Sequence, residues 1–204
     1  MPITRDSYHH GALREALLTA SLQLIEAEGI GAVSLRRVAR EAGVSPGAPY
    51  HHFPDRASLL AALSAQGFQR LAGELAAARA GADSPVGALT ALIRAYVTFA
   101  QQNPAYFRLM FRPELSESQK HPDAEAAEEA AAACLEETVA DCVRAGVIPA
   151  AQADELTVTA WSLGHGMASL WLDGELQDSH GDPGILIAKL TGFFESLLTT
   201  AQLR

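Results

Sequence analysis

The feature that most constrains the fold of this chain is the stretch 34–53, with the sequence SLRRVAREAGVSPGAPYHHF. Ser34 stands before a short apolar-periodic segment, where a helix N-cap is expected. Gly43 follows that segment, at the place where left-handed backbone ends a helix. Ser45 and Pro46 then resemble the cap and the first-turn proline of a second segment. The pattern predicts two short helices joined by a tight turn.

Two short helices joined by a turn that contains glycine form the helix-turn-helix unit. The unit needs a small residue where its helices cross, and Ala39 meets this demand. It also needs apolar residues that hold both helices to the preceding one, and Val38 and Val44 meet it. In such a unit the second helix enters the major groove of DNA while the first braces against the backbone. The stretch is therefore typical of a DNA reader.

Outside this stretch, apolar residues recur at helical spacing between Gly, Pro and Ser breaks, without a convincing strand pattern or repeat. We therefore predict an all-α fold of about nine helices, with an N-terminal three-helix helix-turn-helix domain and a C-terminal helical bundle. The predicted helices span residues 7–28, 35–42, 45–53, 55–79, 85–100, 105–111, 123–145, 152–172 and 184–201. The expected domains are 1–55 for DNA binding, continuing into a linking helix 55–79, and 80–204 for effector binding and dimerisation.

Charge is distributed unevenly along the chain. The formal net charge is −9, but residues 1–70 sum to +1 and the remaining residues to −10. The acidic remainder of the chain is expected to repel DNA, whereas the nearly neutral residues 1–70, with their local arginine clusters, can contact it. Acidic residues that simply solvate a helical surface explain the asymmetry equally well.

Neither a disulfide scaffold nor a membrane anchor is expected. Cys134 and Cys142 have no CxxC spacing and are expected in the core. The first ten residues have no apolar signal-peptide region, which favours a cytoplasmic location. The uncharged run 156–172 contains polar residues and is slightly short for a bilayer, so we predict a buried helix and no membrane contact.

The chain resembles the TetR/AcrR family of bacterial one-component repressors over residues 8–71. The run AGVSPGAPYHHFPDR is similar to the family pattern AGVS-x-G-x-x-Y-x-HF-x-x-K. Ala48 and Pro49 depart from it, since the family often has Thr or Ser and then Leu at these positions. Pro49 has no N–H and would weaken the first turn of the recognition helix. Arg56 replaces the usual Lys, which keeps the charge and adds donors.

The resemblance implies roles for individual residues in DNA binding. Tyr50 and Arg56 are expected to contact phosphates, and Gly47 to permit close approach of the backbone. His51 and the exposed atoms of Pro46 and Ala48 are expected to face base edges. For the arginines of the first short helix, a solvated surface is the alternative. The predicted DNA-binding residues are Arg36, Arg37, Ser45, Pro46, Gly47, Ala48, Tyr50, His51 and Arg56.

A second motif, WSLGHG at residues 161–166, resembles the C-terminal domain of a TetR subgroup named for its Trp, His and Gly. Two apolar stripes on this helix, and two on the last one, predict that each helix packs on two sides. Close approach of another backbone would explain Gly164 and Gly166. In the family the last two long helices typically form a four-helix dimer interface. The interface candidates are Leu163, Met167, Leu170, Leu186, Leu190, Phe193 and Leu197.

Aromatic residues concentrate between the reader and these last helices, either as a filled core or as an effector cavity. The resemblance favours a cavity for a small apolar or aromatic effector. The cavity candidates are Tyr96, Phe99, Ala100, Tyr106, Phe107, Met110, Phe111, Trp161 and His165.

We expect no metal, no cofactor and no enzymatic activity. Adjacent histidines, His9-His10 and His51-His52, point about 100° apart on a helix and chelate poorly. The glutamate pairs 128–129 and 136–137 are typical of a solvated surface. The sequence thus predicts a homodimeric repressor of a palindromic operator, released by an effector. The alternatives are a helical interaction module that has lost DNA binding and an enzyme on a helical scaffold.

Overall fold

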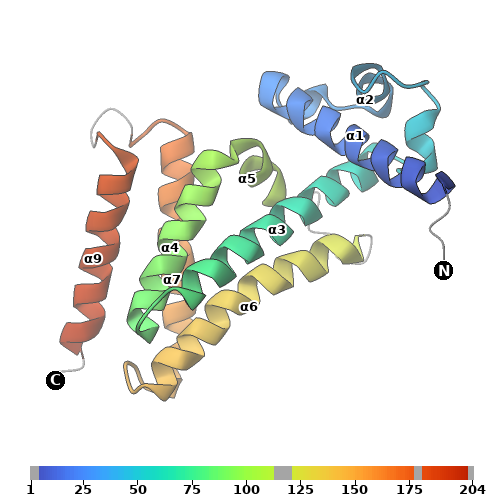
Figure 1. Ribbon diagram of the computed structural model, residues 1–204. Coiled ribbons are helices and arrows are strands. Elements are labelled where there is room, and N and C mark those ends of the chain that lie inside the picture. Colours follow the sequence, from blue (N-terminus) through green and yellow to red (C-terminus); the bar gives the residue numbers. More distant parts are fainter. Residues whose placement is uncertain (1–4, 113–120, 177–180, 202–204) are drawn as a thin grey trace. The chain divides into compact units, whose positions relative to one another are not determined.

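The computed structural model describes residues 5–112, 121–176 and 181–201, with the side chains of 5–11 and 201 excluded. These ranges are helical and contain no strand, which confirms the all-α prediction (Figure 1). The α-helices are α1 (Arg5–Glu28), α2 (Leu35–Glu41), α3 (Arg56–Ala80), α4 (Pro85–Gln102), α5 (Pro104–Met110), α6 (Pro122–Arg144), α7 (Ala153–Leu172) and α9 (Pro183–Ala201). Short 3-10 helices are η1 (Ile30–Ala32), η2 (Ala48–His51) and η5 (Ala150–Gln152). The expected loop 112–122 lies largely outside the described residues.

Side-chain caps fix the predicted starts of three helices. The Ser34 hydroxyl accepts a hydrogen bond from the Arg37 amide, and the Ser84 hydroxyl accepts one from the Gly87 amide. Asp55 precedes α3, and its carboxylate accepts hydrogen bonds from both the amide and the hydroxyl of Ser58. These bonds satisfy amide groups that have no partner inside the helix.

One predicted element is wrong in type. The second helix of the DNA reader, expected over residues 45–53, is not an α-helix but the short 3-10 helix η2. Pro46 and Pro49 remove two amide donors within this segment, so an α-helical bond ladder cannot run through it. The described residues accordingly hold eight α-helices, with η2 in the place of the ninth.

The chain divides into two compact units, which differ from the predicted domains. Residues 1–67 and 105–126 form the first unit, and residues 68–104 and 127–204 form the second. Helix α3 is divided near its middle between the two units, whereas α6 has only its first turn, residues 122–126, in the first unit and the rest in the second.

The first unit is built around apolar residues of α1, α2 and the first half of α3. Leu17, Val38 and Leu59 are completely buried there. Helix α5 packs in this unit against Gly67 of α3. A Cβ atom built at Gly67 would lie 2.5 Å from Met110 Sδ and 3.0 Å from Tyr106 Cδ1. The absence of a side chain at Gly67 therefore lets Met110 and Tyr106 of α5 pack closely against α3.

The second unit is centred on α4, which packs against both α7 and α9 (Figure 1). One core cluster joins residues of α4, α6, α7 and α9, including Leu89, Cys142, Leu156 and Phe194. Cys142 lies in the core as expected, whereas Cys134 is only half-buried, contrary to the expectation. No helix in the part of the chain that the structure describes is long and apolar enough to cross a membrane.

Candidate DNA-reading surface and effector region

The turn after α2 has the geometry that its sequence predicts. Gly43 has a φ of +68°, and the Val44 amide donates to the Ala39 carbonyl at 2.9 Å. Val38 and Ala39 are almost completely buried, so α2 is fixed against the rest of its unit. The chain therefore leaves α2 in a defined direction and enters residues 45–51, which we call the reading segment.

The reading segment exposes most of the residues predicted to contact DNA. Ser45, Pro46, Gly47, Tyr50 and His51 are exposed, while Ala48 is half-buried. Tyr50 keeps 53% of its surface accessible, which is unusual for so large an aromatic side chain.

Two buried residues hold the reading segment in place. Pro49 is buried at the centre of η2, and its carbonyl accepts hydrogen bonds from the amides of His52 and Phe53, both at 2.9 Å. Phe53 is 3% exposed, and the Arg14 guanidinium lies over its ring, 5.5 Å from the centroid. Pro49, which stands where the family pattern often has Leu, is thus a buried residue that packs inside this unit.

The predicted DNA-contacting arginines have different surroundings. Arg36 is exposed on α2. The half-buried Arg37 forms an ion pair with Glu28 at the end of α1. Arg56 is exposed, but its guanidinium is already bound: Nε donates to the Val33 carbonyl at 2.9 Å, and a terminal nitrogen donates to the Ile30 carbonyl at 2.8 Å.

In the second unit, three of the predicted effector residues lie together. The Tyr96 hydroxyl is hydrogen-bonded to His165 Nδ1 at 2.8 Å, and the Trp161 ring centroid lies 5.9 Å from that of His165. Burial raises the pKa of Tyr96 and lowers the pKa of His165, so both side chains stay neutral near neutral pH. Trp161 itself is 51% exposed.

A small apolar cavity of about 40 Å³ lies beside this group. Its lining comes from Leu75, Leu92, Ile93, Tyr96, Leu135, Ala160, Trp161 and Gly164. A Cβ built at Gly164 would lie 3.5 Å from the Tyr96 ring, so this glycine faces a side chain rather than another backbone, contrary to expectation. Around Gly166 there is no heavy atom within 4 Å of such a Cβ.

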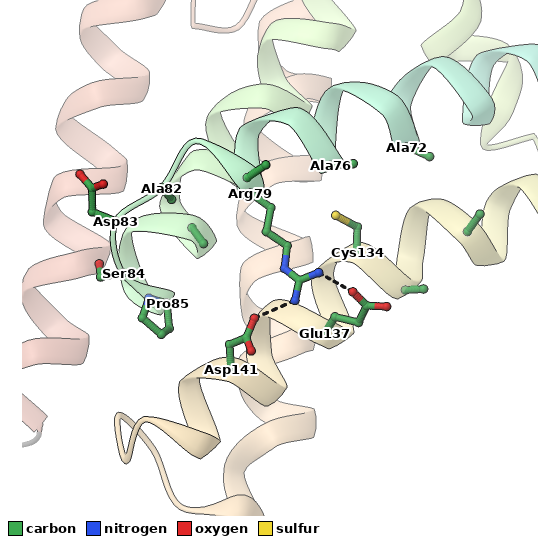
Figure 2. A pocket seen from close by; sticks show the side chains of 14 residues that line it. Ala72, Ala76, Arg79, Ala82, Asp83, Ser84, Pro85, Cys134, Glu137 and Asp141 are labelled. Atoms are coloured by element: carbon green, nitrogen blue, oxygen red, sulfur yellow. Dashed lines mark hydrogen bonds and ion pairs between the residues drawn. The ribbon is translucent and has the colours of Figure 1, made fainter.

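A larger open cleft of about 690 Å³ lies in the second unit between the end of α3, the start of α4 and α6 (Figure 2). Half of its lining residues are alanine. Arg79 crosses it and forms ion pairs with Glu137 and, at 2.7 Å, with Asp141. The guanidinium holds the pKa of Asp141 below its usual value. Cys134 also lines the cleft, and burial raises the pKa of its thiol.

Several predicted effector residues are core residues. Phe99 and Ala100 are completely buried in the second unit, and neither lines the two concavities just described. Tyr106, Phe107 and Met110 are buried on α5 in the first unit, where Phe107 also packs against the half-buried Phe111. The close approach of Tyr106 and Met110 to Gly67 is one sign that α5 packs in a core, and the sequence analysis did not use it.

The predicted dimer-interface residues also separate into two groups. Met167 is buried in the core of its own chain beside Val97 and Ile187, and Leu163 and Leu190 pack against that cluster. Leu186 is half-buried. The exposed apolar residues of α7 and α9 include three interface candidates, Leu170, Phe193 and Leu197. They also include three residues that the predicted interface did not contain, Val158, Trp161 and Ile185.

In the ranges that the structure describes, no three His, Cys, Asp or Glu side chains are grouped so that they could hold a metal ion. The side chains of His9 and His10 lie outside those ranges.

Two family models match the chain. Residues 17–63 match the model described as bacterial regulatory proteins of the tetR family. Residues 89–194, which include the WSLGHG motif, match the model described as a tetracyclin repressor-like C-terminal domain.

Solved structures have a similar fold. A structure of a protein with unknown function from Rhodococcus sp. RHA1 is 32% identical, with a TM-score of 0.79, and covers 93% of this chain and 96% of its own. The transcriptional regulator FadR from Bacillus subtilis, solved in complex with stearoyl-CoA, has a TM-score of 0.70 but only 13% identity over 90% of this chain and 96% of its own, so it shows the fold alone.

Curated relatives match over a shorter range. The HTH-type transcriptional regulator BetI from Rhizobium meliloti is 37% identical over 81 residues, which are 40% of either chain. The nucleoid occlusion factor SlmA from Actinobacillus pleuropneumoniae is 28% identical over 48% of either chain. The chain thus spans about half the length of the curated relatives it matches or less. On the two family models and the exposed reader that α2 and η2 form, the chain belongs to the TetR family of bacterial transcriptional regulators, which are not enzymes.

Proposed function

We propose that the chain is a homodimeric transcriptional repressor, which binds a palindromic operator and releases it when a small apolar or aromatic molecule binds. The observation that carries this proposal is the exposed reading segment after the firmly packed helix α2. The functional division is the predicted one, with residues 1–55 binding DNA and residues 80–204 binding the effector and the second subunit. Such a repressor works in the bacterial cytoplasm, where the operator is.

In the DNA complex, Tyr50 contacts a phosphate through its hydroxyl, and the exposed edge of η2 faces the bases. His51, Pro46, Gly47 and Ala48 form that edge together with Ser45. Arg36 and Arg37 of α2 reach the phosphate backbone of the DNA. To do so, Arg37 must first break its ion pair with Glu28. Arg56 does not belong to the phosphate-binding set, because its guanidinium is bound to two backbone carbonyls.

The effector enters beside Tyr96, Trp161 and His165. Ligand pockets generally measure about 300–1,000 Å³, whereas the cavity beside these residues measures about 40 Å³. An effector must therefore displace side chains, and the half-exposed Trp161 is the residue at the surface that can move. A ligand that binds only the opened form shifts the protein toward that form, and operator affinity falls if the opened form fits DNA less well.

The dimer forms through the exposed apolar residues of α7 and α9. Phe193, Leu197 and Ile185 of α9 are exposed, whereas Ile187 and Phe194 of the same helix are buried. Exposed apolar surface of this extent is a common mark of a protein interface. A two-fold dimer then presents two reading segments to two operator half-sites.

The proposal is tested by a DNA-binding titration with the duplex that flanks the chain's own gene. Specific binding, compared with a scrambled duplex at the same salt concentration, supports it. Binding to neither duplex would instead favour the second candidate, an interaction module that has lost DNA binding, which the departures at Ala48 and Pro49 keep open.

A further inference from the structure

Arg56 occupies the first position of α3, directly after the capping residue Asp55. From there its side chain reaches back to the connection between α1 and α2. Nε donates to the carbonyl of Val33, and a terminal nitrogen donates to the carbonyl of Ile30. The distances of 2.9 and 2.8 Å are those of well-formed hydrogen bonds.

The two carbonyls lie at the entry to α2. Val33 is 2% exposed and directly precedes Ser34, the N-cap of α2. The Ile30 carbonyl also accepts the Val33 amide at 3.2 Å, which closes η1. A side chain that binds these two carbonyls therefore fixes the position at which α2 begins. The direction of α2 in turn sets the direction of the reading segment.

We propose that Arg56 is a positioning residue of the DNA reader, which clamps the entry to α2 and so orients the reading segment, rather than a phosphate ligand. The inference rests on the proposed DNA-binding function. Its chemistry is specific to arginine, because two N–H groups of the planar guanidinium bind two acceptors in a fixed geometry. A lysine ammonium keeps the positive charge but cannot donate to both carbonyls in this fixed geometry.

The conservative variant Arg56→Lys separates the two roles. If Arg56 were a phosphate ligand, Lys would serve equally well. If Arg56 is a clamp, Arg56→Lys weakens operator binding about tenfold, the effect of losing roughly one charge-assisted hydrogen bond. Binding to a scrambled duplex changes little, so the specificity ratio falls. The slope of log affinity against log salt stays the same, whereas each lost phosphate contact lowers it by about 0.9.

The experiment measures fluorescence anisotropy with the duplex upstream of the chain's own gene and with a scrambled duplex, at several salt concentrations. Arg144→Lys is the matched control, since Arg144 is an exposed arginine of the second unit, ion-paired with Asp141. Unchanged operator affinity in Arg56→Lys overturns the inference. Equal losses on both duplexes also overturn it, because a residue that orients the reading segment must lower the affinity for the operator more than the affinity for the scrambled duplex. A purely structural role lowers the unfolding temperature and leaves the specificity ratio of the folded protein unchanged, which overturns it too.

Hydrogen exchange tests the clamp without DNA. In Arg56→Lys, amides of α2 are expected to exchange faster than in the wild type, while those of α7 keep their rates. Unchanged exchange in α2 overturns the clamp. Wild-type protein that binds neither duplex refutes the proposed function, and the exchange result still decides whether Arg56 holds α2.

Discussion

At the scale of single residues, several helices begin at a capping residue whose side chain binds an amide of the first turn, and such residues can be recognised in the sequence. Ser34, Asp55 and Ser84 each bind an amide three residues further on. These contacts are local, and a serine or aspartate before an apolar-periodic segment is enough to predict them. The hydrogen bonds of Arg56 were not predictable in this way, because its acceptors lie 23 and 26 residues earlier in the chain.

The cap at Asp55 gives a pH-dependent prediction. Hydrogen bonds from Ser58 hold the pKa of Asp55 below its ordinary value of 3.8. The charged carboxylate therefore stabilises the fold above pH 3.8, and this contribution is lost as the pH falls through the lowered pKa. We expect Asp55→Ala to reduce the free energy of unfolding by about 1 kcal/mol at pH 7. Urea titrations should show the difference from wild type shrinking below pH 3.8.

Asp83→Ala serves as the control for this prediction, since Asp83 is also exposed and lies just before a helix. It should change the free energy of unfolding by much less. A loss in Asp55→Ala that persists at acid pH would show that the charged cap is not its cause.

The phenol of Tyr50 gives a second prediction at this scale. A phosphate contact positions the protein and carries no sequence information. We therefore expect Tyr50→Phe, which removes only the hydroxyl, to weaken binding to operator and scrambled duplexes alike, by about fivefold. Anisotropy titrations measure both affinities. A loss confined to the operator would assign Tyr50 to base recognition instead.

At the scale of elements, the sequence predicts the α-helices well, including the short helices α2 and α5, and the type of the reading segment less well. Helices α3, α4, α6, α7 and α9 begin and end within a few residues of their expected positions, because many periodic apolar residues and clear breaks define each one. The reading segment is too short for periodicity to decide its type. Ser45 and Pro46 are typical of the start of an α-helix. Pro46 and Pro49 nevertheless remove two amide donors, and the segment forms a 3-10 helix instead.

The effector region was only partly predictable for a different reason. Aromatic residues mark a cavity and a filled core equally, and only three-dimensional packing distinguishes them. Tyr96 and Trp161 line the small cavity, whereas Phe99 is completely buried elsewhere. Ala100 is also completely buried and does not line that cavity.

Two glycines of α7 offer a test of the effector region. Replacing either Gly164 or Gly166 with alanine should stabilise the helix by up to about 1 kcal/mol. The new methyl group of Gly164→Ala lies at contact distance from the Tyr96 ring and fills the cavity, whereas that of Gly166→Ala meets no neighbour. We therefore expect Gly164→Ala alone to weaken the response to an effector found by thermal-shift screening. Equal responses in both variants would place the effector site elsewhere.

At the scale of the whole molecule, the division of charge and apolar surface agrees with a dimeric regulator. The first seventy residues carry a net charge of +1 and the others carry −10. The sequence predicted double-sided packing of the last two helices, but it could not say which stripe faces the chain's own core. In the structure, Met167 and Ile187 face inward, while Phe193 and Leu197 remain exposed.

The exposed stripe of α9 gives the last prediction. Phe193 is 63% exposed, more than any other large apolar residue described. If it lies in a two-fold interface, Phe193→Asp places two buried charges close together and separates the subunits, because an unpaired buried charge costs several kcal/mol. Sedimentation at micromolar concentration should give about twice 21.6 kDa for the wild type and a single chain mass for the variant.

The same variant should lose most of its operator affinity, since one reading segment cannot bind two half-sites at once. Ala132→Asp, on the exposed face of α6, is the control and should remain dimeric. Circular dichroism must show equal helix content in all three proteins, so that loss of the dimer is not loss of the fold. A Phe193→Asp variant that still sediments as a dimer would move the interface away from α9. A monomeric wild type would remove the basis for a palindromic operator.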